Sequence, residues 1–187
     1  VDFAVAMTRQ DSPEGIPLPE GGTYAYTAHG IDEVYFEAST NPGEPRKPLE
    51  RIASTGEISR FLLALKSALA GADTVPVLIF DEIDIGIGGR SGEVIGRKLW
   101  NLAQTHQVIC VTHLPQIAAF AGAHYTVNKH TEGGRTTSAI RELRGEERFR
   151  EIAVMLGGPR YTESALAAAR ELIENAAAFG RVRKTTG

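Results

Sequence analysis

The sequence of 187 residues contains very little cysteine, since Cys110 is the single one. An intramolecular disulfide and a zinc site built from several cysteines are therefore excluded. No run of about 18 apolar residues occurs, which argues against a membrane-spanning helix. The formal net charge is −3, so a protein that binds nucleic acid through a large overall positive charge is not expected.

An initiating methionine and a signal peptide are also missing. The chain begins with Val1-Asp2-Phe3, which has the character of a β-strand rather than of a basic and then apolar targeting segment. A chain that begins inside a structural element is predicted to be a piece of a longer protein.

A third absence concerns nucleotide binding. The phosphate-binding loop of P-loop nucleotidases has the pattern Gly-x-x-x-x-Gly-Lys-Ser/Thr. This sequence contains no Gly-Lys pair at all. A complete P-loop nucleotide site within this chain is therefore excluded.

What is present is ordinary globular composition, with 42% hydrophobic and 23% charged residues. The length predicts a single domain over residues 1–187. Six of the nine prolines precede residue 50, and residues 1–50 are expected to form antiparallel strands and loops. Residues 51–160 are expected to alternate between strands and helices, and residues 161–187 to form a C-terminal helix with a frayed basic tail from Arg181.

Hydrophobic patterning predicts the individual elements. Strands are expected at 3–7, 23–27, 34–37, 77–80, 107–112, 125–129 and 136–141, and helices at 56–70, 91–105, 114–120, 146–156 and 162–179. The strands at 125–129 and 136–141 are expected to form a hairpin around residues 132–135. Strands 77–80 and 107–112 are continuous apolar runs, which are typical of strands buried on both faces of a parallel sheet. The fold class is therefore α/β, a mixed sheet whose parallel core strands are flanked by helices and antiparallel strands.

The sharpest chemical signal is the pair Asp81-Glu82, which directly follows strand 77–80. The carboxyl ends of parallel strands face the ligand crevice of an open α/β sheet. One carboxylate there can help to hold Mg²⁺, and its neighbour can orient or deprotonate an attacking water. The alternative is a strand that ends in two solvated acids.

His113 follows strand 107–112 and is expected at the same edge of the sheet. An imidazole there can hydrogen-bond a terminal phosphate. The alternative, a histidine that caps the next helix or contacts water, is the better interpretation of His113 alone. The convergence with Asp81 and Glu82 favours the functional interpretation.

Two further segments belong to this set. Ser54-Thr55-Gly56-Glu57 spans the start of the helix at 56–70, where amides of the first turn can bind an anion. The same residues also fit an ordinary capping box, and both interpretations are compatible. Asp84 to Gly89 form a glycine-rich loop after the acidic pair, which by itself is weak evidence.

Taken in order, these motifs resemble the RecN family of SMC-like, ABC-type ATPases of bacterial DNA double-strand break repair. The resemblance runs from about residue 30 to residue 160 and rests on Asn41 to Glu44, Ala53 to Arg60, Phe80 to Gly86 and Thr112 to Gln116. It implies that the chain is the C-terminal lobe of a P-loop ATPase head. The N-terminal lobe and a coiled coil would then lie upstream.

The resemblance also implies the role of each residue in ATP binding and hydrolysis. It assigns Asp81 to Mg²⁺, Glu82 to the attacking water and His113 to sensing the γ-phosphate. The signature motif, presented to ATP held by a second head, would comprise Ser54, Thr55, Gly56 and Glu57, and the loop that crosses the dimer interface would include Asp84, Gly86 and Gly88. Thr55 departs from the family pattern, because a side chain replaces a glycine where backbone approaches phosphate.

At the level of the protein, the resemblance implies ATP hydrolysis between two heads of a homodimer, with none by this chain alone. It implies DNA contact through the intact assembly and a cytoplasmic, nucleoid-associated location. Two alternatives remain open: a helicase-type motor lobe, echoed by Asp81-Glu82-Ile83-Asp84, and a non-catalytic module for dimerisation or DNA interaction. The interleaved charges of residues 141–151 favour a salt-bridged surface over a DNA-binding one.

Overall fold

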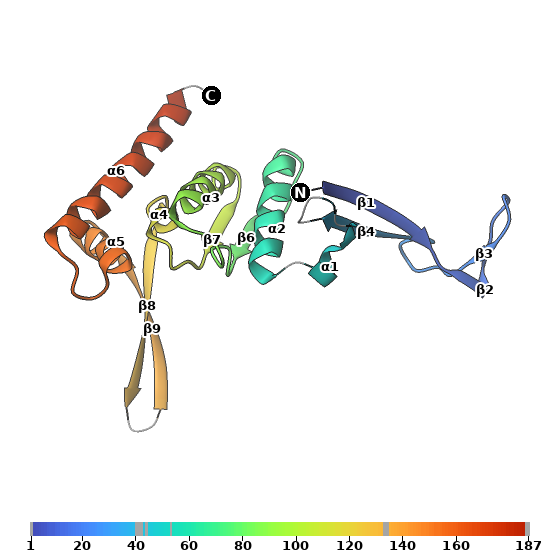
Figure 1. Ribbon diagram of the computed structural model, residues 1–187, viewed down its shortest axis with the longest axis horizontal. Helices are drawn as coiled ribbons and strands as arrows, with labels where there is room; N and C mark the ends of the chain where they lie inside the picture. The colour runs from blue at the N-terminus through green and yellow to red at the C-terminus, as the bar shows by residue number, and fades with distance from the viewer. Residues whose placement is uncertain (1, 40–42, 44, 53, 133–134, 186–187) are drawn as a thin grey trace. The chain divides into compact units, whose positions relative to one another are not determined.

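The computed structural model describes residues 2–39, 43, 45–52, 54–132 and 135–185 (Figure 1). The chain divides into two compact units, Val1–Ser54 and Thr55–Gly187. This boundary lies close to the change in composition near residue 50. The residues Ala53, Gly133 and Gly134, and most of the expected linker at 41–45, fall outside the described part.

The first unit contains two small antiparallel sheets. One has the strand order β1-β4-β5 and the other pairs β2 with β3. The elements are β1 (Asp2–Arg9), β2 (Asp11–Pro17), β3 (Thr23–Tyr24), β4 (Asp32–Ser39), β5 (Lys47–Pro48) and α1 (Leu49–Ile52). The strands at 3–7 and 34–37 are confirmed as β1 and β4, whose register runs from Asp2↔Ser39 to Arg9↔Asp32.

The sequence prediction is less accurate between and beyond these two strands. The strand expected at 23–27 is only two residues long, and β2 was not expected because it contains Pro13 and Pro17. Proline lacks the backbone donor of a sheet ladder and is confined to edges and irregular positions. The β2–β3 pair is such a case, because its register shifts between Asp11 and Ile16.

The second unit carries the strand and helix alternation (Figure 1). Its elements are α2 (Thr55–Leu69), β6 (Val77–Phe80), α3 (Gly89–Leu102), β7 (Gln107–Cys110), α4 (Pro115–Ala118), β8 (His124–Glu132), β9 (Arg135–Leu143), α5 (Glu146–Gly157) and α6 (Glu163–Thr185). Strands β6 and β7 are parallel, with Phe80 opposite Cys110. The predicted parallel pair is therefore confirmed, and the expected basic tail is helical as far as Thr185.

The prediction of a single mixed sheet is wrong for the described residues. They form four separate small sheets, and the antiparallel strands do not extend the β6–β7 pair. Strands β8 and β9 pair with each other along their whole length, which confirms the antiparallel pairing of the predicted hairpin. Adjacent strands joined by a short turn pair at little entropic cost, which favours this local hairpin over a longer-range sheet.

The expectation that β6 and β7 are buried on both faces is also wrong. Leu78 and Phe80 are buried, whereas Ile79 is 65% exposed and Ile109 is 45% exposed. The reason is that the hydrophobic cluster involving helices α2, α3 and α4 packs against one set of alternating side chains only.

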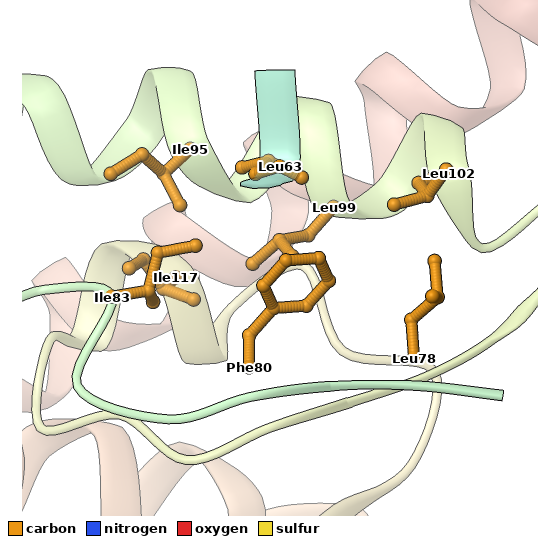
Figure 2. Close-up of a cluster of buried hydrophobic side chains, with 8 residues drawn as sticks. All are labelled: Leu63, Leu78, Phe80, Ile83, Ile95, Leu99, Leu102 and Ile117. Carbon is orange, nitrogen blue, oxygen red and sulfur yellow. The ribbon is translucent and has the colours of Figure 1, made fainter. Parts of the chain in front are cut away.

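This cluster is the main core of the second unit (Figure 2). Phe80 is 1% exposed and lies among side chains from β6, the turn after β6, α2, α3 and α4, namely Leu63, Leu78, Ile83, Ile95, Leu99, Leu102 and Ile117. Burial of one such large apolar side chain contributes about 1.5–3 kcal/mol. The core therefore anchors β6 immediately before the acidic pair.

A second cluster joins α4, α5 and α6 through Ala118, Ile152, Ala153 and Ala169. Among the described residues, no helix combines the length and the apolar character needed to cross a membrane.

Candidate functional site

The carboxyl ends of β6 and β7 bring the predicted acidic pair and histidine to the same edge. The backbone N–H of Val111 donates to the carbonyl of Phe80 at 2.9 Å, so the strand pairing continues to the end of β6. Asp81 and Glu82 follow β6 directly, and His113 lies just after β7. The carboxyl groups are on exposed residues, and the His113 side chain is 70% exposed.

The backbone at Glu82 adopts a conformation that is rare for residues with a side chain. Its φ angle of 56° lies in the left-handed region, and such strain is commonly found at functional sites. The N–H of Glu82 donates to Oδ1 of Asp81 at 2.9 Å, and its carbonyl accepts from the N–H of Ile85 at 3.2 Å. The acidic pair therefore sits on a tight, hydrogen-bonded turn.

Side chains of helix α2 donate hydrogen bonds to this turn. Ser59 Oγ donates to the carbonyl of Asp81 at 2.9 Å. Arg60 Nη1 donates to the carbonyls of Ile83 at 3.1 Å and Ile85 at 2.9 Å. Three backbone acceptors of the turn are thus satisfied by side chains of one helix, which stabilises a turn that has little regular structure of its own.

The signature-like segment lies against the same turn. A Cβ atom at buried Gly56 would lie only 2.9 Å from the carbonyl oxygen of Glu82, so this close approach requires glycine. Thr55 and Glu57 are exposed in the first turn of α2, and Ser54 belongs to the first unit.

Asp84 is the most enclosed polar group of the site, with 2% residue exposure. Its Oδ2 accepts hydrogen bonds from Thr112 Oγ1, from the N–H of His113 at 2.8 Å and from the N–H of Leu114 at 3.3 Å. The same oxygen lies 3.1 Å from Nδ1 of His113. Asp84 therefore links the turn after β6 to the segment after β7.

The surroundings of Asp84 also set its pKa. Burial by itself raises the pKa of this carboxyl, but hydrogen bonds from Thr112 and His113 outweigh burial and hold the pKa below its ordinary value. The carboxylate is therefore ionised at neutral pH.

Sequence reasoning placed Asp84 in an interface loop and missed Thr112. No local pattern marks this contact, which joins residues 28 positions apart.

The glycine-rich loop that follows has two different glycines. Gly86 has a φ angle of 74°, which favours glycine. Gly88 is extended, with φ −101°, and precedes α3 as its N-cap residue. A Cβ atom at either position would contact nothing within 4 Å, so backbone conformation requires glycine at Gly86 alone.

The residues present fit a magnesium ion that is bound mainly through phosphates. Among the described residues no group of three His, Cys, Asp or Glu side chains can hold a metal. Mg²⁺ in nucleotide sites usually takes one or two carboxylates together with phosphates and water, and the exposed carboxylate of Asp81 can supply such a ligand.

The site is an open edge rather than a closed pocket. A cavity of about 300 Å³ elsewhere in this unit is lined by α3, by residues 119–122 after α4, by Arg148 of α5 and by α6, and none of the predicted site residues lines it. The acidic pair and His113 thus form an exposed surface of acidic and imidazole groups.

Comparisons with known proteins show similarity to DNA repair proteins named RecN. The chain is 46% identical over 178 residues to DNA repair protein RecN of Streptomyces coelicolor, 49% identical over 146 residues to that of Xylella fastidiosa and 41% identical over 174 residues to that of Bacillus subtilis. These matches cover 95%, 78% and 93% of this chain but 31%, 26% and 30% of the relatives. The chain therefore spans about a third of the length of the curated relatives that it matches.

No protein-family model matches the chain. A solved chain from work on ATP-driven dimerisation and DNA-stimulated activation of SMC ATPases superposes with a TM-score of 0.43 at 20% identity. That superposition covers 64% of this chain and 71% of the solved chain.

Proposed function

Because the chain is homologous to the RecN DNA repair proteins over about a third of their length, we propose that it is the C-terminal part of an SMC-like ATPase head. In the intact protein this head acts in DNA double-strand break repair and recombination. ATP and Mg²⁺ are bound between two heads of a homodimer, and the ATP is hydrolysed there, whereas the 187-residue chain alone hydrolyses essentially no ATP.

One observation carries this proposal. The parallel pairing of β6 and β7 brings Asp81, Glu82 and His113 to one edge, where Asp84 ties the two loops together. Transfer of a phosphoryl group from a nucleotide to water requires acidic and imidazole groups close to the terminal phosphate, and adjacent strand ends supply them here.

Each residue has a distinct role in the proposed reaction. Asp81 contributes a carboxylate toward Mg²⁺, which, when bound, neutralises charge on the phosphates. Glu82 accepts a hydrogen bond from the attacking water, orients it and takes up its proton. His113 hydrogen-bonds the terminal phosphate through its exposed ring.

The start of α2 acts on a second nucleotide. Ser54, Thr55, Gly56 and Glu57 present backbone groups to ATP that is held by the partner head, and the Thr55 side chain weakens that approach. The loop containing Asp84, Gly86 and Gly88 crosses between the heads.

The exposed face of β6 and β7 supports the proposal that an upstream lobe completes this head. Ile79, Ile109 and Val111 are 65%, 45% and 58% exposed on this small sheet, and exposed apolar patches are typical of contact surfaces. The upstream lobe and a coiled coil come from the part of the polypeptide outside this chain. The protein is then cytoplasmic and associated with the nucleoid.

DNA contact is assigned to the intact assembly. Arg141 pairs with Glu147 at 2.6 Å, and Arg144 pairs with Glu142 at 2.7 Å. Arginines already paired with carboxylates offer little free positive charge to a phosphate backbone, which supports the salt-bridged interpretation of this surface.

The test is Mg-ATP turnover by the full-length protein and by the 187-residue chain, with Glu82→Gln in both. Turnover only in the full-length protein, lost in the Glu82→Gln variant, is the expected result. Turnover by the chain alone would contradict the proposal that this chain carries only part of the ATPase site. Absence of turnover in both forms would favour the non-catalytic interaction module.

A further inference from the structure

The buried carboxylate of Asp84 is oriented toward the segment that carries His113. All of its hydrogen bonds with this segment converge on one atom, Oδ2, which receives the Thr112 hydroxyl and the N–H groups of His113 and Leu114. A second bond links the donors themselves, since the N–H of Leu114 also donates to Thr112 Oγ1 at 3.0 Å. The segment around His113 is therefore bound at three consecutive residues, through the side chain of Thr112 and the backbone N–H groups of His113 and Leu114.

The ring of His113 lies close to the same carboxylate oxygen. Its Nδ1 lies 3.1 Å from Oδ2 of Asp84. An ionised carboxylate can only accept hydrogen bonds, so its proximity to Nδ1 favours the tautomer that carries the hydrogen on this nitrogen. In the neutral imidazole, Nε2 is then the unprotonated nitrogen, and it belongs to a side chain that is 70% exposed.

Asp84 can orient a neighbouring group because the turn at 81–85, which carries it, is itself held in place. Arg60 of α2 donates to the carbonyls of Ile83 and Ile85, the two residues that flank Asp84. Ile83 is fully buried in the main core. The carboxylate thus stands on a turn anchored by both packing and hydrogen bonds.

We propose that Asp84 is a positioning residue, which fixes the tautomer and orientation of the His113 ring for contact with the terminal phosphate of ATP. This inference rests on the proposed function and deepens it. Asp84 does not touch the reacting atoms. Its effect on hydrolysis passes entirely through His113, as an orienting carboxylate acts on a histidine that binds a metal or a substrate.

A purely structural role would hold the loop without selecting a ring tautomer, and the two roles differ in a spectroscopic signature. Long-range proton–nitrogen correlation spectra of the nitrogen-15-labelled chain at alkaline pH distinguish the Nδ1–H from the Nε2–H form of each neutral histidine. His113→Gln identifies the signal of His113 among the five histidines. We expect the Nδ1–H form for His113, and a wild-type spectrum dominated by the Nε2–H form would overturn the proposal.

Two substitutions weaken the contact between Asp84 and His113 to different degrees. Asp84→Ala removes the acceptor, whereas Asp84→Asn retains a carbonyl oxygen at the same place without the charge. In the full-length protein we expect kcat for ATP to fall about ten- to a hundredfold in Asp84→Ala, as is typical when an orienting partner is removed, with little change in KM. Asp84→Asn should be intermediate, both in kcat and in the Nδ1–H fraction of His113.

The controls separate this inference from the proposed function. Glu93→Gln removes a carboxylate from an exposed i,i+4 pair with Arg97 and should leave kcat unchanged. The folded fraction of each variant is measured by circular dichroism, so that loss of fold is not counted as loss of positioning. If Glu82→Gln abolishes turnover but folded Asp84→Ala keeps wild-type kcat, positioning by Asp84 is overturned and the ATPase assignment stands. If wild-type full-length protein shows no turnover, the proposed function fails, and with it the phosphate role of His113.

Discussion

At the scale of single residues, the site depends on a few close contacts around the turn at 81–85. Glu82 has a left-handed backbone, and Gly56 allows α2 to approach its carbonyl. Asp84 remains ionised in a buried position because donors on the neighbouring segment surround it. Conformational and desolvation costs are thus offset locally, by residues with specific shapes and hydrogen-bonding groups.

The close approach at Gly56 predicts a large effect of a small substitution. Gly56→Ala should lower the free energy of unfolding of the chain by about 1–3 kcal/mol, because the new methyl group meets a backbone oxygen that cannot move freely. The measurement is urea-induced unfolding followed by circular dichroism. Gly71→Ala is the matched control, since a Cβ there contacts nothing within 4 Å. Equal stabilities of the two variants would show that α2 does not pack on the turn in this way.

Cys110 provides a prediction with a defined pH dependence. Burial, followed by the negative charges of Asp84 and Asp81, raises the pKa of its thiol to about 12. Because the thiolate is the reactive form, modification of the folded chain at neutral pH should be at least about a hundredfold slower than that of the urea-unfolded chain. The rate for the folded chain should still be rising at pH 10. Stopped-flow titration with a disulfide reagent measures both rates, and similar rates would contradict the buried environment.

At the scale of elements, β6 and β7 form a sheet with one packed face and one open face. Helices α2, α3 and α4 contribute the side chains that bury Leu78 and Phe80. The opposite side chains, including Ile79 and Ile109, remain accessible. An element with this asymmetry is expected to respond differently to substitution on its two faces.

Substitutions on β6 test this asymmetry and the proposed upstream lobe together. In the 187-residue chain, Phe80→Ala should cost about 3–5 kcal/mol, whereas Ile79→Ala should cost well under about 1 kcal/mol because its side chain is already solvated. In the full-length protein Ile79→Ala should become destabilising, since the upstream lobe would cover it. Thermal unfolding of both forms measures this change, with Val94→Ala as a control at an exposed position of α3. A neutral Ile79→Ala in the full-length protein would mean that this face stays uncovered.

At the scale of the whole molecule, the two units differ in how much core they have. Both hydrophobic clusters among the described residues consist of side chains from the second unit. Among the described residues of the first unit, Ala38 is the one buried hydrophobic residue, and Phe3 and Phe36, whose rings lie 5.5 Å apart, remain 44% and 37% exposed. The second unit thus contains the apolar burial that stabilises a fold.

This difference predicts that residues 55–187 fold alone. Removing residues 1–54 should preserve a cooperative thermal unfolding transition and the helical circular dichroism signal of α2 to α6, because the packed clusters remain complete. Residues 1–54 alone should show no cooperative transition. A truncated chain 55–187 without cooperative unfolding would mean that the first unit stabilises the second.

Local patterns predicted the elements of the second unit well. The strand at 77–80, the helix beginning near Gly56 and the short helix beginning near Pro115 were predicted with boundaries close to those observed, because each depends on periodicity or a start signal within a few residues. The parallel pairing of 77–80 with 107–112 followed from the intervening helix. Strand β2 was missed, since its prolines oppose the pattern of a strand.

From the amino-acid order alone follow the α/β alternation, the missing phosphate-binding loop and the adjacency of Asp81 and Glu82 at a strand end. The folded chain adds what depends on distant residues meeting: the one-sided burial of β6, the contact of Gly56 with Glu82 and the hold of Asp84 on Thr112 and His113. Periodicity and strand order are encoded over short distances along the chain. Burial and buried hydrogen bonds are properties of three-dimensional packing, so they become visible only when the elements are assembled.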